Sequence, residues 1–259
     1  MTHYEDAGGP GQPVLALHGT FGRGRTFAAL ADRLQPDYRL IAPDLRGHGA
    51  IPDRRGRTTR CDFSREAFVA DVAQFIETHD LAPALVIGHS LGGVTAYQLA
   101  ARHPDLVRAV VVEDVGAIPG DAVLDVTNWP TKFASREAAA TFFAATPAPE
   151  YFLESVDPNG NLMFDLDDMM AAQRGNVGDW WADWLAVRRP LMLLRATNSF
   201  LLSADHAAQL VRRRPGTRLV TFADTGHWIH REAPDAYAEA VRGFFRSLPE
   251  PTTSRPPAG

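Results

Sequence analysis

The strongest constraint on the fold is a glycine-flanked turn at residues 88–92, with the sequence Gly-His-Ser-Leu-Gly. The apolar run 84–87 precedes this turn, and residues 93–100 have the composition of a helix. The order predicts a strand, a sharp turn and a helix, with Ser90 at the apex of the turn. A glycine on each side keeps a Cβ out of a crowded bend. A serine hydroxyl presented in this way becomes a nucleophile when a base removes its proton.

The composition and charge of the chain indicate which classes of protein it resembles. The chain has 259 residues, a hydrophobic content of 45%, a charged content of 22% and a net charge of -5. These values are typical of a soluble globular protein, and no basic stripe suggests a nucleic-acid partner. No apolar run is long enough to span a bilayer and no signal peptide is visible, so we expect no membrane partner and a cytoplasmic location.

The single cysteine, Cys61, excludes an intrachain disulfide, and its spacing to other residues suggests no metal site or catalytic thiol. We therefore expect no metal and no cofactor. The expected oligomeric state is a monomer or a homodimer.

Apolar runs that alternate with helical patterns predict a parallel sheet covered on both faces. The expected strands are 13–17, 38–42, 84–87, 107–112, 191–194 and 217–222, and helical spacing is found at 26–34, 63–79 and 234–245.

Residues 116–188 interrupt this rhythm. They lack clear strands and are rich in aromatic residues, with helical stretches at 135–145 and 165–173. We interpret them as a helical cap inserted into a core formed by residues 1–115 and 189–247. Residues 248–259 are rich in Pro, Ser and Thr and are expected to be disordered.

Four motifs together resemble those of the α/β-hydrolase superfamily. They are His-Gly-Thr-Phe-Gly at 18–22, Asp-Leu-Arg-Gly-His-Gly at 44–49, Gly-His-Ser-Leu-Gly-Gly at 88–93 and Gly-His-Trp-Ile-His at 226–230. Within the superfamily they are most similar to small cap-bearing serine esterases of the ABHD11-like or bacterial acyl-CoA-esterase-like type. The resemblance implies an α/β-hydrolase fold with a mostly parallel sheet, helices on both faces and an inserted helical cap.

The base for Ser90 should be a histidine in the loop after the last predicted strand, since that loop overhangs the turn. His227 and His230 both lie there. The resemblance favours His227, which matches the family histidine, over its rival His230.

The orienting acid is where the chain departs from the common pattern. In most of the superfamily it follows the penultimate strand, but residues 195–203 contain no carboxylate, and Phe200 stands where many relatives show Asp. The next acid, Asp205, begins a predicted helix. The other source is the strand after the turn helix, which ends at Glu113 and Asp114. ABHD11-like esterases carry an Asp-Ile-Gly/Ala-Pro-type segment there, so the resemblance assigns Asp114, with Glu113 and Asp205 as alternatives.

An oxyanion hole needs backbone N–H groups aimed at the developing negative charge. The residue after the nucleophile, Leu91, supplies one, and the loop at 18–21 supplies the other. Thr20 is the expected donor in that loop, with Phe21 as the alternative. Ser199 resembles a serine that supports the catalytic histidine in some of these esterases. The expected substrate pocket is aromatic and formed by Phe21, Trp129, Phe133, Phe143, Trp181 and Trp228.

The expected activity is hydrolysis of a small-to-medium carboxylic ester, lactone or thioester through an acyl-enzyme on Ser90, with His227 as base and Asp114 as acid. The partner would be a small molecule with an acyl group and an apolar part. Relatives use the same triad for C–C bond hydrolysis, acyl transfer or cofactor-free peroxidase-like chemistry, so these are the alternatives. A non-catalytic ligand-binding module is a further alternative, because fold does not fix function.

Overall fold

The computed structural model describes residues 3–49, 61–120 and 124–250. Within them a 7-stranded sheet has the strand order β1-β3-β2-β4-β5-β6-β7. The strands are β1 (Tyr4–Asp6), β2 (Gln12–Leu17), β3 (Tyr38–Pro43), β4 (Ala84–His89), β5 (Val107–Glu113), β6 (Leu191–Ala196) and β7 (Arg218–Phe222). Neighbouring strands are parallel except for β1, which pairs antiparallel with β3 at the edge of the sheet. Only β1 is absent from the strands that the sequence predicts.

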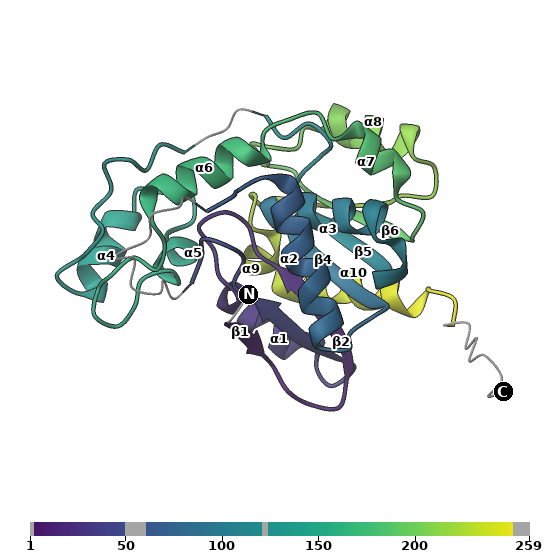
Figure 1. Ribbon diagram of the computed structural model, residues 1–259, viewed down its shortest axis with the longest axis horizontal. Coiled ribbons are helices and arrows are strands. Elements are labelled where there is room, and N and C mark those ends of the chain that lie inside the picture. Colours follow the sequence, from purple (N-terminus) through teal and green to yellow (C-terminus); the bar gives the residue numbers. More distant parts are fainter. Residues whose placement is uncertain (1–2, 50–60, 121–123, 251–259) are drawn as a thin grey trace.

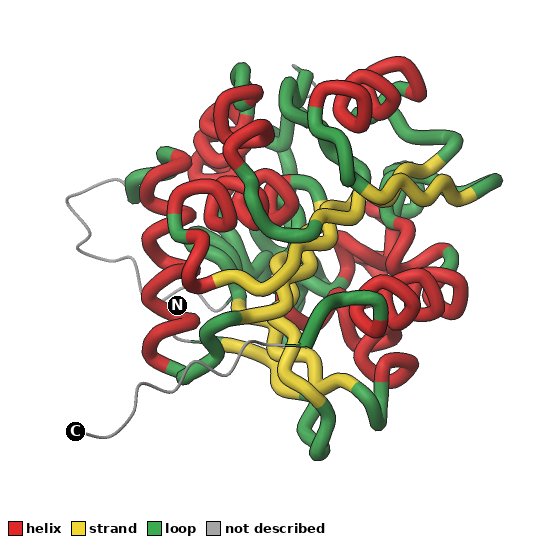
Figure 2. The backbone as a smooth tube through the Cα atoms, turned by 90° about the vertical axis from the view of Figure 1, so that its right-hand side faces the viewer, coloured by secondary structure: helices red, strands yellow, loops and turns green. Residues whose placement is uncertain are grey.

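Two groups of helices cover the two faces of the sheet (Figure 2). One face packs against α2 (Arg65–Thr78), α3 (Leu91–Arg102), α7 (Trp181–Ala186) and α8 (Ala204–Arg213). The other face packs against α1 (Ala28–Leu34), α9 (Ile229–Glu232) and α10 (Pro234–Arg246). Short 3₁₀ turns occupy Gly24–Phe27 and Pro104–Leu106.

Side chains of the central strands alternate between the two cores, because successive residues of a strand point to opposite faces. In β4, Val86 contributes to the core beside α2 and α3, whereas Leu85 and Ile87 contribute to the core beside α1 and α10. Continuous apolar runs therefore mark strands that are buried on both faces.

The connection between β5 and β6 carries α4 (Arg136–Phe143), α5 (Pro149–Leu153), α6 (Leu166–Asn176) and α7. Figure 1 shows α4, α5 and α6 to the left of the sheet, whereas α7 lies beside α8. The side chain of Ser135 caps the N-terminus of α4 by accepting a hydrogen bond from the N–H of Ala138. Buried aromatic residues form a separate core here, and Phe21 and Trp228 pack into that core from outside the insertion.

The predicted disordered tail is described only at its start, because residues 251–259 lie outside the described residues. Leu248 packs against the core beside α10, and the carbonyl of Pro249 accepts a hydrogen bond from Arg108. The folded part of the chain thus continues past residue 247. Among the described helices, none has the length and apolarity needed to cross a membrane.

Candidate active site

The turn after β4 holds Ser90 in a conformation that few residues adopt. Its φ of 52° lies in the left-handed region, which costs free energy for a residue with a Cβ. A Cβ at Gly88 would lie 2.3 Å from the carbonyl oxygen of Gly92, and one at Gly92 would lie 2.1 Å from that of Leu17. Both glycines are therefore required by close backbone contacts. The turn leaves Ser90 9% exposed, on the wall of a pocket.

Asp114 follows the last residue of β5 and is fully buried. Its Oδ1 accepts a hydrogen bond of 3.0 Å from the N–H of Ala196. Its Oδ2 accepts one of 2.6 Å from the hydroxyl of Ser199 and one of 2.7 Å from Nδ1 of His227. Ser199 thus contacts the carboxylate that binds the imidazole, and both oxygens of that carboxylate are held in place.

This contact sets the tautomer of His227. An ionised carboxylate only accepts hydrogen bonds, so Nδ1 carries the proton and Nε2 of the neutral ring has a free lone pair. His227 lines the same pocket as Ser90. The alternative acids lie elsewhere: Glu113 binds His230, and Asp205 is exposed in the first turn of α8.

Phe200, where the resemblance leads one to expect an Asp, places its ring beside the imidazole of His227. The centroids of Phe200 and His227 are 4.8 Å apart, and Phe200 also lies beside Trp228. Phe200 is 57% exposed and lines the pocket, so it forms part of the pocket wall beside the imidazole.

Backbone donors are available beside Ser90. Leu91 is the first residue of α3, and the N–H groups in the first turn of a helix have no partner within the helix. In the loop after β2, the N–H of Phe21 donates to Nε2 of His48 at 3.2 Å. The N–H of Thr20 has no hydrogen-bond partner among the described residues. The geometry therefore favours Thr20 over Phe21 as the second oxyanion donor.

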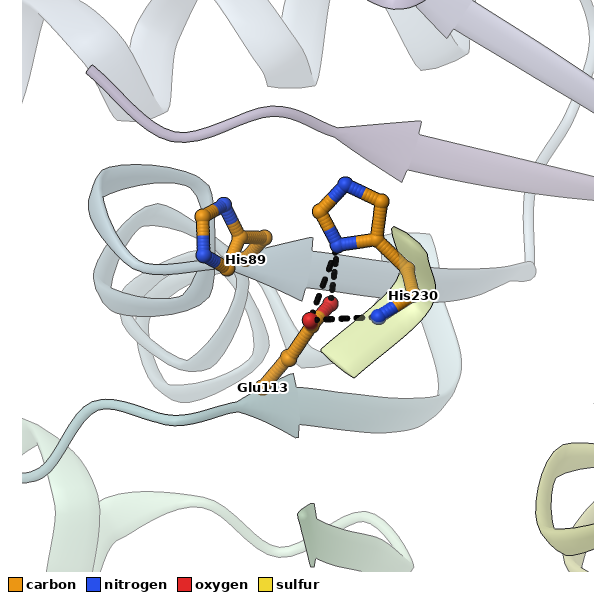
Figure 3. Close-up of side chains that lie close together, drawn as sticks. All are labelled: His89, Glu113 and His230. Carbon is orange, nitrogen blue, oxygen red and sulfur yellow. Dashed lines mark hydrogen bonds and ion pairs between the residues drawn. The ribbon is translucent and has the colours of Figure 1, made fainter. Parts of the chain in front are cut away.

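The sequence reasoning did not identify a second acid–histidine pair, which is formed by Glu113 and His230 (Figure 3). Glu113 Oε1 accepts hydrogen bonds from the backbone N–H of His230 at 3.0 Å and from its Nδ1 at 2.8 Å. Both side chains are completely buried. The signal available in the sequence was the pair of adjacent acids at 113–114 and the pair of histidines three residues apart.

His89 lies beside this pair. Its Nε2 donates to the carbonyl of His227 at 3.1 Å, and burial lowers the pKa of His89 well below its ordinary value. His89, Glu113 and His230 each offer one atom that could coordinate a metal ion, and these three atoms lie within 4.8 Å of one another. The carboxylate is already engaged by His230, whereas Nδ1 of His89 and Nε2 of His230 are buried and have no hydrogen-bond partner among the described residues.

The pocket at Ser90 has a volume of about 310 Å³. None of the described residues that line it is Asp, Glu, Lys or Arg, and most are apolar. They are Thr20, Phe21, His89, Ser90, Pro119, Gly120, Leu124, Pro147, Phe152, Gln173, Asn176, Val177, Phe200, Leu201, His227 and Trp228.

Of the six aromatic residues expected to form the pocket, Phe21 and Trp228 line it. Trp129, Phe133 and Phe143 instead pack together in the core of the insertion. Trp181 packs against the core beneath α3 and α8, with the guanidinium of Arg213 at 3.9 Å from its ring centroid. The insertion has a hydrophobic core of its own, and most of its buried aromatic residues belong to that core.

Comparison with known proteins identifies the family of the chain. Residues 14–240 match the model of the alpha/beta hydrolase family. The chain is 26% identical to the sn-1-specific diacylglycerol lipase ABHD11 of Mus musculus, over 90% of this chain and 80% of that protein. It is 26% identical to the esterase YbfF of Escherichia coli, over 90% of this chain and 92% of that protein.

The solved structure of E-2-(acetamidomethylene)succinate hydrolase superposes with a TM-score of 0.83, at 24% identity and with 94% of each chain covered. This likeness supports the fold. Since the family model covers most of the chain, the protein belongs to the alpha/beta hydrolase family, and it is a hydrolase with esterase and lipase relatives.

Proposed function

We propose that this hydrolase cleaves a small-to-medium carboxylic ester, lactone or thioester through an acyl-enzyme on Ser90. The observation that carries the proposal is the 2.7 Å hydrogen bond between His227 and a fully buried Asp114, at a pocket that also exposes Ser90. Esterase and lipase relatives support an ester-like bond as the target.

In the first half of the reaction, Nε2 of His227 takes the proton of the Ser90 hydroxyl while Oγ attacks the acyl carbonyl. Asp114 keeps Nδ1 protonated and stabilises the imidazolium that forms. The N–H groups of Leu91 and Thr20 stabilise the tetrahedral oxyanion. The imidazolium then gives its proton to the leaving alcohol or thiol, and the acyl group stays on Ser90.

In the second half, His227 removes a proton from water, which attacks the acyl-enzyme. The carboxylic acid leaves and Ser90 regains its proton from the imidazolium. No step needs a metal or a redox cofactor, because His227 moves the protons and the backbone supplies the oxyanion donors.

The pocket supports an uncharged, largely apolar substrate. Its described lining residues include no charged side chain of Asp, Glu, Lys or Arg, and burying an unpaired charge there would be costly. The insertion supplies Leu124, Pro147 and Phe152 to this wall, so we propose that it acts as a cap over the reacting centre.

The test combines Ser90→Ala with a fluorophosphonate probe. We expect wild-type protein to hydrolyse p-nitrophenyl butyrate and to carry the probe on Ser90. Ser90→Ala should lose both, with a turnover at least about 10³-fold lower. Circular dichroism should show an unchanged fold. Undiminished turnover in Ser90→Ala would contradict the proposed nucleophile, and the absence of an adduct on the wild type would favour a non-catalytic binding protein.

A further inference from the structure

The side-chain amide of Asn176, on the pocket wall, has a donor that pairs with none of the described residues. Asn176 is the last residue of α6, and it lines the same pocket as Ser90. Its Oδ1 accepts a hydrogen bond of 3.2 Å from Nη1 of Arg65. Its Nδ2 has no partner among the described residues. Gln173, which also lines the pocket, differs because both its amide atoms bind the backbone of Leu124.

The orientation of this amide is set by Arg65. A guanidinium only donates hydrogen bonds, so it must face the oxygen of Asn176 and not the nitrogen. The backbone of Asn176 is held as well, since its carbonyl accepts a hydrogen bond of 3.1 Å from the indole of Trp180. Nδ2 is thereby left as the free end of the amide.

Arg65 is itself fixed by neighbours of defined polarity. It is buried, and its Nε donates to Oε1 of Gln98 at 2.9 Å, while Nη2 donates to the hydroxyl of Thr95. The amide of Gln98 is oriented in turn, because its Nε2 donates to Oδ2 of Asp183 at 3.0 Å. A carboxylate only accepts, so this contact leaves the Gln98 oxygen for Arg65.

Asp183 is anchored at the far end of the chain of contacts by Arg102. The Nε and Nη2 atoms of Arg102 donate to its two carboxylate oxygens at 3.0 and 2.7 Å. This fork geometry holds the carboxylate in one orientation. Each hydrogen bond between Arg102 and Asn176 thus has a fixed donor and a fixed acceptor. The residues that form these bonds belong to helices α3, α7, α2 and α6.

The buried guanidinium also affects the strength of the free donor. No carboxylate of the described residues is hydrogen-bonded to Arg65, and burial lowers the pKa of Arg65 to about 10, so it stays charged at neutral pH. Its charge polarises the Asn176 amide, which strengthens Nδ2 as a donor. An oriented donor in a largely apolar pocket is the usual device by which a site fixes and selects a ligand.

We propose that Asn176 is a specificity-determining residue, whose Nδ2 donates a hydrogen bond to a neutral oxygen acceptor on the substrate. The preferred substrates then carry a carbonyl or ether oxygen in addition to the scissile acyl group. A carboxylate is disfavoured, because the described pocket wall offers no cation to pair with it. The inference rests on the proposed acyl-hydrolase function and specifies its substrate class.

The test compares matched esters that differ by one oxygen. One series consists of p-nitrophenyl esters of straight-chain acids and of the corresponding keto acids, with the ketone moved one carbon at a time. A second series keeps the acyl group as butyrate and places the ketone in the alcohol. For the best-placed ketone, we expect wild-type kcat/KM to exceed that of the methylene counterpart by roughly tenfold, the size of one hydrogen bond.

Two variants separate donation from a structural role. Asn176→Leu removes the amide and should abolish the ketone preference, measured as the ratio of kcat/KM for each ketone ester to kcat/KM for its methylene counterpart in the same variant. Asn176→Asp keeps an oxygen for Arg65 but presents an acceptor to the pocket, so the preference should reverse. Thermal unfolding checks that each variant is folded.

Preference ratios that are unchanged in both variants, or a wild type that prefers no ketone, would overturn the inference while the proposed function stands. No turnover of any ester by the wild type would instead contradict the proposed function, and the inference with it.

Discussion

Two acid–histidine pairs lie side by side at the end of β5, and they differ in what they face. Asp114 and His227 are joined by a hydrogen bond of 2.7 Å, and His227 lines the pocket with Ser90. Glu113 and His230 are joined by a bond of 2.8 Å, but both are sealed, and the ring of His230 packs 4.8 Å from that of Phe27. Both pairs consist of a carboxylate and an imidazole, so access to Ser90 separates the proposed catalytic pair from the buried one.

The backbone of β5 explains why neighbouring carboxylates serve different purposes. Glu113 is the last strand residue and follows the alternation of Ala109 and Val111, which point to the core beside α10. Asp114 leaves the strand with a φ of 52°, and its side chain contacts His227. His227 lies just before α9 and contacts Asp114, whereas His230 lies within α9 and contacts Glu113.

The largest expected effect is that of Asp114→Asn on turnover. An amide can donate to Nδ1, which places the imidazole proton on Nε2 and removes the lone pair that Ser90 needs. We expect kcat to fall about 10⁴-fold with little change in the free energy of unfolding. Kinetics on p-nitrophenyl butyrate measure this. Asp205→Asn is the control, and a loss of activity in that variant with Asp114→Asn still active would show that the acid lies at 205.

Substitution in the buried pair of Glu113 and His230 should lower the stability of the protein. Glu113→Ala leaves the buried N–H groups of His230 without a partner, so we expect a loss of about 3–5 kcal/mol in the free energy of unfolding. Urea titration followed by circular dichroism measures it. Glu113→Gln retains an acceptor oxygen and should lose less. A Glu113→Ala protein of normal stability would remove the distinction between the two pairs.

A smaller effect on activity is expected from Ser199→Ala. The variant removes the 2.6 Å hydrogen bond to the Asp114 carboxylate, and bonds to charged groups contribute about 1.5–3 kcal/mol. If part of this acts on the transition state, kcat falls roughly tenfold. The matched control is Ser203→Ala, which removes the N-cap of α8 and should cost about 1 kcal/mol of stability without affecting kcat. Equal kinetics in the two variants would exclude a role for Ser199 in positioning.

A last effect, on stability alone, is a pH dependence that comes from buried histidines. Burial lowers the pKa of His18 to about 4 and that of His48 to about 3. Below pH 6.5 the unfolded chain binds protons at these rings while the folded protein does not, so stability falls as the pH drops from about 6.5 toward 4. Each histidine contributes about 1.4 kcal/mol per pH unit in this window. Urea unfolding at pH 7.5, 6.5 and 5.5 measures the slope, and a flat profile would show that the rings are accessible to protons.

The sequence predicted the framework of the molecule because each signal was local. Apolar runs of four to six residues identified the six parallel strands, and the glycines at 88 and 92 located the turn. The absence of a carboxylate at 195–203 directed attention to Asp114, and the structure places that residue against His227. Strand β1 escaped detection because three exposed or half-buried residues at a sheet edge carry no apolar pattern.

Only the tertiary structure shows which side chains line the pocket and which groups are hydrogen-bonded to each other. Aromatic composition could not distinguish Trp129, which packs inside the insertion, from Phe152, which lines the pocket. The choice of Thr20 over Phe21 as the second oxyanion donor depends on the hydrogen bond from the Phe21 N–H to His48, which lies 27 residues away in sequence. The unused donor of Asn176 likewise depends on Arg65, which lies 111 residues away. Sequence patterns report burial and turns, whereas the direction of a hydrogen bond depends on a partner that only folding brings near.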